Sequence, residues 1–171
     1  MRGRITGTGS YVPANTLTNA DLENMVATSD QWITERTGIR SRAVVGPGEA
    51  CSDLAVKAAR RALEAAHISA TDLDMILLAT CTGDYPLPAT ACLIQHQLGA
   101  TKAAACDLSA ACCGFVYALS VADAYVKTGM RQVLVGPLRQ VDAAPVDVAV
   151  ELSRHVLAQR APLLPSPGAP A

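Results

Sequence analysis

Residues 103–127 read AAACDLSAACCGFVYALSVADAYVK. Ala103–Leu108 form a short apolar run typical of a buried parallel strand, and residues 112–127 carry the apolar spacing of a helix. A strand that passes through small residues into a helix is the repeating unit of α/β proteins. This segment therefore predicts an α/β fold with a largely parallel sheet.

The same alternation of strand and helix patterns extends to both sides of this segment. Strands are predicted at residues 4–11, 39–45, 74–80 and 132–135, and helices after Thr18 and at residues 29–36, 53–66 and 89–98. The helix at 53–66 is the clearest of these, because its Leu and Ala residues form one stripe and its charged residues lie elsewhere.

The pattern changes after Gly136. Six of the ten prolines lie in residues 137–171, and residues 162–171 show neither helical nor strand periodicity. We therefore expect residues 1–136 to form the α/β unit and residues 137–171 to be a proline-rich, largely disordered tail.

The composition is that of a folded globular chain, with 171 residues, 50% of them apolar and 17% charged. This length suits one domain, or one half of a larger enzyme. A net charge of −1 argues against broad nucleic-acid binding. No uncharged segment reaches the roughly 20 residues that cross a bilayer, so we expect neither a nucleic-acid nor a membrane partner.

Cysteine usage bears on the cellular compartment and on metal binding. The sequence starts without the apolar segment of an export signal, so we expect a cytoplasmic protein whose six cysteines are reduced. No Cys-x-x-Cys pair is present, and we expect no metal site.

Cys112 is the strongest candidate for a reactive residue, because it lies where the predicted strand passes into the helix. Unpaired N–H groups at a helix N-terminus favour the thiolate, which is the nucleophilic form of cysteine. Adjacent helical residues point about 100° apart, so Cys113 is expected to face the core. The other cysteines (51, 81, 92, 106 and 113) are expected to be small buried hydrophobic residues.

Trp32 and Arg36 form the second candidate site. Residues four apart on a helix are neighbours on one face, so an indole and a guanidinium group would lie side by side. Such a pair can hold a flat heterocycle such as adenine, with positive charge available for nearby phosphates. A cation–π pair on the surface without a ligand is the alternative.

Two further patterns are not expected to carry chemistry. Gly7-Thr-Gly9 follows the first strand as in a dinucleotide-binding loop, but Val12 occupies the third glycine position of that motif. The three histidines have no neighbours that mark a general base, so each is expected to be structural or exposed.

Several segments closely resemble β-ketoacyl-acyl-carrier-protein synthase III. They are GTGSY at residues 7–11, TNADLE at 18–23, TSDQW at 28–32, RTGIR at 36–40 and DLSAACCGF at 107–115. The resemblance covers residues 1 to about 136, roughly the N-terminal half of such an enzyme. It implies a thiolase-like fold, in which two similar α/β halves pack as layers and two chains form a homodimer. This chain would supply one half, followed by an unmatched tail.

The resemblance also implies a function and residue roles. The enzyme would be an acyltransferase that initiates fatty-acid synthesis by condensing acyl-CoA with malonyl-acyl-carrier protein. Cys112 would carry the acyl group as a thioester, and Thr28, Trp32 and Arg36 would bind CoA. Leu87 stands where the family often has a phenylalanine of the acyl pocket, so a wider pocket is implied. Acyl-CoA would be a substrate, and no separate cofactor is implied.

The second half of such an enzyme carries a His and an Asn that bind the thioester carbonyl during decarboxylation. Nothing in residues 137–171 matches it, so the resemblance implies a truncated chain that is inactive or impaired in condensation. Two alternatives stay open. One is a non-catalytic remnant or interaction module that retains the CoA clamp, and the other is a polyketide-type synthase.

Overall fold

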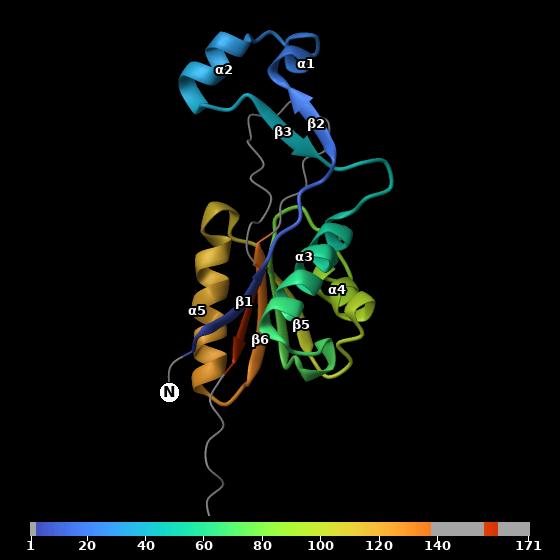
Figure 1. Cartoon of the computed structure of the whole chain (residues 1–171), viewed down its shortest axis with the longest axis vertical. Coiled ribbons are helices and arrows are strands. Elements are labelled where there is room, and N and C mark those ends of the chain that lie inside the picture. Colours follow the sequence, from blue (N-terminus) through green and yellow to red (C-terminus); the bar gives the residue numbers. More distant parts are fainter. Residues whose placement is uncertain (1–2, 138–155, 161–171) are drawn as a thin grey trace, which may run out of the picture.

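The computed structural model describes residues 3–137 and 156–160, which form an α/β core and a smaller lobe (Figure 1). The strands of the core are β1 (Ile5–Gly9), β4 (Met75–Ala79), β5 (Ala104–Leu108), β6 (Gln132–Pro137) and β7 (Val156–Arg160). Its helices are α3 (Cys51–Ala66), α4 (Thr90–Leu98) and α5 (Gly114–Lys127). Two short 3₁₀ helices, Ala70–Asp72 and Ala111–Cys113, complete it.

The strands of the core form one mixed sheet in the order β1-β7-β6-β4-β5. β4 pairs in parallel with both β5 and β6. β7 runs antiparallel to both of its neighbours, β1 and β6, so β1 has the same direction as the parallel strands. All strands of this sheet except β7 therefore run in one direction, in line with the predicted parallel arrangement, and the carboxyl ends of β4, β5 and β6 meet at one edge.

Helices cover both faces of this sheet (Figure 1). Ile76 and Leu78 of β4 belong to the hydrophobic cluster with α3 and α4, whereas Met75 and Leu77 belong to the cluster with α5. Successive side chains of a strand point to opposite faces, so one strand contributes to both clusters. This explains why β4 is apolar at every position and buried throughout.

Helix α3 packs against β1 because the strand presents glycines to it. A Cβ atom added at Gly9 would overlap the Ala58 carbonyl oxygen and the Ala62 nitrogen, and one added at Gly7 would overlap α3 in the same way. The paired glycines therefore permit a close approach of strand and helix backbones.

The small lobe, Asn15–Val44, consists of β2 (Asn15–Thr18), α1 (Asn19–Glu23), α2 (Asp30–Thr37) and β3 (Ser41–Val44). β2 and β3 form an antiparallel pair. Buried Asn19 donates from Nδ2 to Asp30 Oδ1 at 2.7 Å and to the Ile39 carbonyl at 2.9 Å. This one amide group therefore joins the two helices and the segment that leads into β3.

The observed elements differ from the predicted ones in three places. The helix predicted from Cys112 begins at Gly114 instead, because Ala111 has a φ of +44°, which no α-helix accommodates. β2 was not predicted. Of the expected tail at residues 137–171, the structure describes only Pro137, in β6, and Val156–Arg160, which form β7. The rest lies outside the described residues, so the boundary at Gly136 stays a prediction.

In the ranges 3–137 and 156–160, no helix combines the length and the apolar character needed to cross a membrane.

Candidate functional site

Cys112 lies in the 3₁₀ turn Ala111–Cys113, between the carboxyl end of β5 and the start of α5, and its side chain is exposed. Carboxyl ends of parallel strands are the usual location of binding sites in open α/β sheets. The strand-to-helix junction predicted from the sequence is therefore present, and it presents this thiol to solvent.

Contacts from the neighbouring strand hold this turn. The Ala111 amide donates to Cys81 Sγ at 3.3 Å, and Cys81 Sγ lies 3.3 Å from Ser109 Oγ. A positive φ at a residue other than glycine is unfavourable unless its surroundings hold it, and the bond to Cys81 contributes to that restraint. Gly114 then packs onto β4, since a Cβ atom there would lie 3.2 Å from Ala79 Cβ.

The cysteines depart from the expectation of burial. Cys51 is fully buried, and burial raises the pKa of its thiol to about 12, so it stays a neutral core residue. Cys92 is partly buried, but Cys81, Cys106 and Cys113 are exposed, so the prediction for these three was wrong. Cys113 precedes α5 at its N-cap position, without a hydrogen bond from its side chain to the helix, and so it does not lie on the core-facing side of α5.

Asp107 joins the turn region to α4, which the sequence analysis did not foresee. Its carboxylate accepts hydrogen bonds from the Thr90 and Ala91 amides, both at 2.8 Å. α4 begins after Ala89, which has no side chain that could cap it. An alanine at the N-cap position was the signal in the sequence that the first amides of α4 need a hydrogen-bond acceptor from elsewhere in the chain.

A second carboxylate holds the loop between β4 and α4. Asp84 Oδ1 accepts from the Ser52 amide at 3.0 Å near the start of α3, and the Asp84 amide donates to Thr90 Oγ1 at 2.9 Å. The loop that contains Leu87 is therefore bound at its base to two helix N-termini.

Replacing Asp107 with alanine is expected to lower the free energy of unfolding by about 2 to 3 kcal/mol, because two amides at buried positions lose a charged acceptor. Urea denaturation followed by circular dichroism measures this loss. Asp107→Asn, which keeps one acceptor oxygen, is expected to lose less than Asp107→Ala. Equal stability of Asp107→Ala and the unaltered chain would contradict the capping role.

Leu87 projects from this loop and is 86% exposed. Tyr85, on the same loop, is 62% exposed. The described residues of this chain therefore form no enclosed pocket around Leu87.

Trp32 and Arg36 lie together on α2, as their spacing predicted. The Arg36 guanidinium carbon is 5.0 Å from the centroid of the Trp32 ring, and Trp32 is 46% exposed. Ser29 Oγ accepts from the Trp32 amide at 3.1 Å and so caps the helix, and Gly38 ends it in the left-handed conformation. Thr28 lies just before this cap and is partly buried.

The structure thus places the two candidate sites on different parts of the molecule. Trp32 and Arg36 belong to the small lobe, and Cys112 belongs to the core (Figure 1). In the described part of the chain, His, Cys, Asp and Glu side chains form no group of three that could hold a metal ion.

Comparison with known proteins identifies relatives of this arrangement. The family model for 3-oxoacyl-[acyl-carrier-protein (ACP)] synthase III matches residues 106–137. A β-ketoacyl-[acyl-carrier-protein] synthase III from Caldanaerobacter subterraneus subsp. tengcongensis is 56% identical over 132 residues, which are 77% of this chain and 40% of that protein.

Solved structures show the same architecture. The 3-oxoacyl-[acyl-carrier-protein] synthase III of Aquifex aeolicus VF5 is similar with a TM-score of 0.83 at 41% identity, over 92% of this chain and 53% of that one. The priming β-ketosynthase from the R1128 polyketide biosynthetic pathway gives a TM-score of 0.85 at 33% identity, over 95% of this chain and 51% of that one.

The chain spans about 40% of the length of the curated relatives that it matches. The fold class expected from the sequence, one α/β half of a thiolase-like architecture, is confirmed. The roles of the individual residues stay predictions.

Proposed function

This chain belongs to the β-ketoacyl-acyl-carrier-protein synthase III family, and from this we propose that it carries the acyl-accepting site of such an enzyme. One observation supports this proposal above all others. Cys112 is exposed at the strand-to-helix junction, where the carboxyl ends of parallel strands meet.

The proposed first step is transfer of an acyl group from acyl-CoA to Cys112. The Cys112 thiolate attacks the thioester carbonyl, a new bond forms between Sγ and the carbonyl carbon, and CoA leaves as its thiolate. The Cys112 amide is proposed to stabilise the negative charge on the carbonyl oxygen during attack. In the second step malonyl-acyl-carrier protein loses carbon dioxide, and the resulting carbanion attacks the acyl-Cys112 thioester, which restores the thiolate.

Trp32 and Arg36, with Thr28 beside them, are proposed to hold the nucleotide end of CoA. The exposed indole offers an adenine a flat apolar surface, and Arg36 brings positive charge to it. The alternative of a surface pair without a ligand predicts no change in CoA affinity when the pair is broken.

Trp32→Ala is expected to weaken CoA binding about tenfold, because stacking of a base on an aromatic ring contributes roughly 1 to 3 kcal/mol. Isothermal titration calorimetry with CoA measures the affinity without relying on tryptophan fluorescence. Tyr125→Ala on α5, which also removes a partly exposed aromatic side chain, serves as the matched control and should leave the affinity unchanged. Equal CoA affinities of the unaltered chain and Trp32→Ala would refute the proposed role of Trp32 and Arg36 in CoA binding.

Two exposed apolar surfaces support further association in the whole enzyme. The outer face of α5 exposes Val116 and Tyr117, at 60% and 54%, and we propose that a second α/β half covers it.

Leu87 and Tyr85 are proposed to reach a second copy of the chain in a homodimer, with Leu87 lining the acyl pocket of that copy. Such an enzyme would work in the cytoplasm, with acyl-CoA and malonyl-acyl-carrier protein as its substrates.

A polyketide-type priming synthase is the second candidate. The likeness to the R1128 priming β-ketosynthase favours it, since that structure gives a TM-score of 0.85 over 95% of this chain, against 0.83 over 92% for the synthase III of Aquifex aeolicus VF5, although the identity is 33% against 41%. Both candidates use Cys112 and differ in the carrier protein that accepts the acyl group. Incubation of acyl-labelled protein, supplied with its second half, with malonyl groups on fatty-acid and on polyketide carriers distinguishes them by which carrier becomes labelled.

A further inference from the structure

The small lobe is joined to the core by two chain segments, residues 10–14 and 45–50 (Figure 1). Both segments reach the first turns of α3. Two covalent connections alone would let the lobe change its angle relative to the core, so the contacts at this junction decide how firmly it is held.

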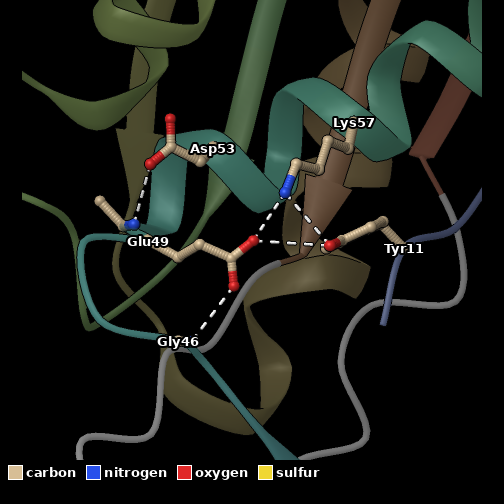
Figure 2. A network of polar contacts seen from close by, with 6 residues as sticks. Tyr11, Gly46, Glu49, Asp53 and Lys57 are labelled. Atoms are coloured by element: carbon tan, nitrogen blue, oxygen red, sulfur yellow. Dashed lines mark hydrogen bonds and ion pairs between the residues drawn. The ribbon is translucent and has the colours of Figure 1, made fainter. Parts of the chain in front are cut away.

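A polar network joins both segments to α3 (Figure 2). Lys57 Nζ, on α3, donates to Glu49 Oε1 at 2.6 Å and to the Tyr11 hydroxyl at 3.1 Å. The Tyr11 hydroxyl also lies 3.5 Å from Glu49 Oε1. The second carboxylate oxygen of Glu49 accepts from the Gly46 amide at 3.1 Å. One ammonium group therefore bridges the outgoing and the returning segment.

Cations above the Tyr11 ring strengthen the attachment of the first segment. Lys57 Nζ lies 4.4 Å and Arg61 Cζ 5.6 Å from the ring centroid. Arg61 also donates to the Ser10 carbonyl at 2.5 Å. The returning segment is fixed a second time where the Ala50 amide donates to Asp53 Oδ2 at 2.9 Å (Figure 2).

The ion pair between Lys57 and Glu49 is partly exposed, with 44% and 25% of the two side chains accessible. Solvent screens such a pair, so its main effect is geometric. The hydrogen bond from Lys57 lowers the pKa of Glu49, so this carboxylate stays charged to a more acidic pH than an ordinary glutamate.

We infer that Tyr11, Glu49 and Lys57 are positioning residues that hold the small lobe, with Trp32 and Arg36, at a fixed distance from Cys112. The consequence for acyl transfer rests on the proposed function. A CoA thioester bound at one end by the lobe reaches the thiol at its other end only when the two sites are correctly spaced, and small misplacements are costly to rate.

The spacing can be measured directly, because Trp32 is the single tryptophan of the chain. In a parent chain with Cys81, Cys92, Cys106 and Cys113 replaced by serine, Cys112 is the one exposed thiol among the described residues. A fluorescent acceptor attached there reports the distribution of distances from Trp32 through time-resolved energy transfer. Lys57→Met is expected to broaden this distribution, and Lys57→Arg is expected to restore it.

Two further variants complete this measurement. Tyr11→Phe removes the hydroxyl and keeps the ring, so a smaller broadening in the same direction is expected even if Lys57→Met folds poorly. Lys127→Met removes the Lys127–Asp123 ion pair within α5, which is of similar exposure, and should leave the distribution unchanged. An unchanged distribution in both Lys57→Met and Tyr11→Phe would overturn the inference.

Acyl transfer supplies the second readout. Lys57→Met is expected to slow acetylation of Cys112 by acetyl-CoA about tenfold, with no change for acetyl-pantetheine, which lacks the nucleotide. Equal slowing with both donors would indicate a general structural effect and count against positioning. If the chain with all of its native cysteines accepts no acetyl group at all, the proposed function fails, while the distance distribution still decides whether the network holds the lobe.

Discussion

Cys112→Ala is expected to abolish acylation of this chain, lowering the rate of acetyl transfer from acetyl-CoA by about 10³-fold or more, as loss of a nucleophile does in enzymes that form covalent intermediates. The reason is that this substitution removes Sγ, the atom proposed to form the thioester bond with the acyl group. Intact-protein mass spectrometry detects the acetyl adduct, and peptide mapping locates it.

Cys113→Ala is the matched control, because Cys113 is adjacent, exposed and equally small. It should leave the adduct in place. An adduct on Cys113, Cys81 or Cys106 in the unaltered chain would contradict the assignment. CoA binding without any adduct would instead favour the non-catalytic interaction module.

The same experiment separates acylation from condensation. We expect the 171 residues by themselves to accept an acetyl group and yet to form little or no condensation product with malonyl-acyl-carrier protein. Residues that stabilise the developing negative charge typically contribute about 10² to 10³ in rate each, and the resemblance implies that the His and Asn of this step belong to a second half that residues 137–171 do not match. Near-normal condensation by the purified chain would refute this expectation.

Gly9→Ala is expected to reduce the free energy of unfolding by about 3 kcal/mol, because a methyl group there would overlap the backbone of α3 at Ala58 and Ala62. The neighbouring atoms are backbone atoms of a helix and cannot rotate away. Either β1 moves from α3 or the helix shifts, and both changes disturb the hydrophobic cluster on this face of the sheet. Guanidinium denaturation measures the loss.

Thr8→Ala provides the comparison, since Thr8 lies between the two glycines with its side chain exposed. It is expected to change stability by less than about 0.5 kcal/mol, as surface substitutions usually do. A Gly9→Ala chain as stable as Thr8→Ala would mean that β1 and α3 are not in close backbone contact.

Much of the candidate site was predictable from neighbouring residues. Trp32 and Arg36 face each other because four positions along a helix return a side chain to the same face, whatever surrounds the helix. The strand, the small residues and the helix around Cys112 were equally local signals. The prediction failed where backbone conformation departed from the regular pattern, as at Ala111, whose positive φ delays the start of α5.

Other features required contacts between distant segments, which no local pattern encodes. The antiparallel insertion of β7 between β1 and β6 depends on which backbone edges are left to pair. Asp107 caps α4 only because β5 brings its carboxylate to that helix.

Burial of the cysteines likewise follows from what covers each strand and helix, which the residue type alone does not reveal. Local periodicity was sufficient for the pairing of Trp32 with Arg36 and for most of the elements, but not for β2, β7 or the start of α5. The bridge from Tyr11 through Glu49 to Lys57 arises only after folding, because its members come from two connecting segments and a helix that meet in space.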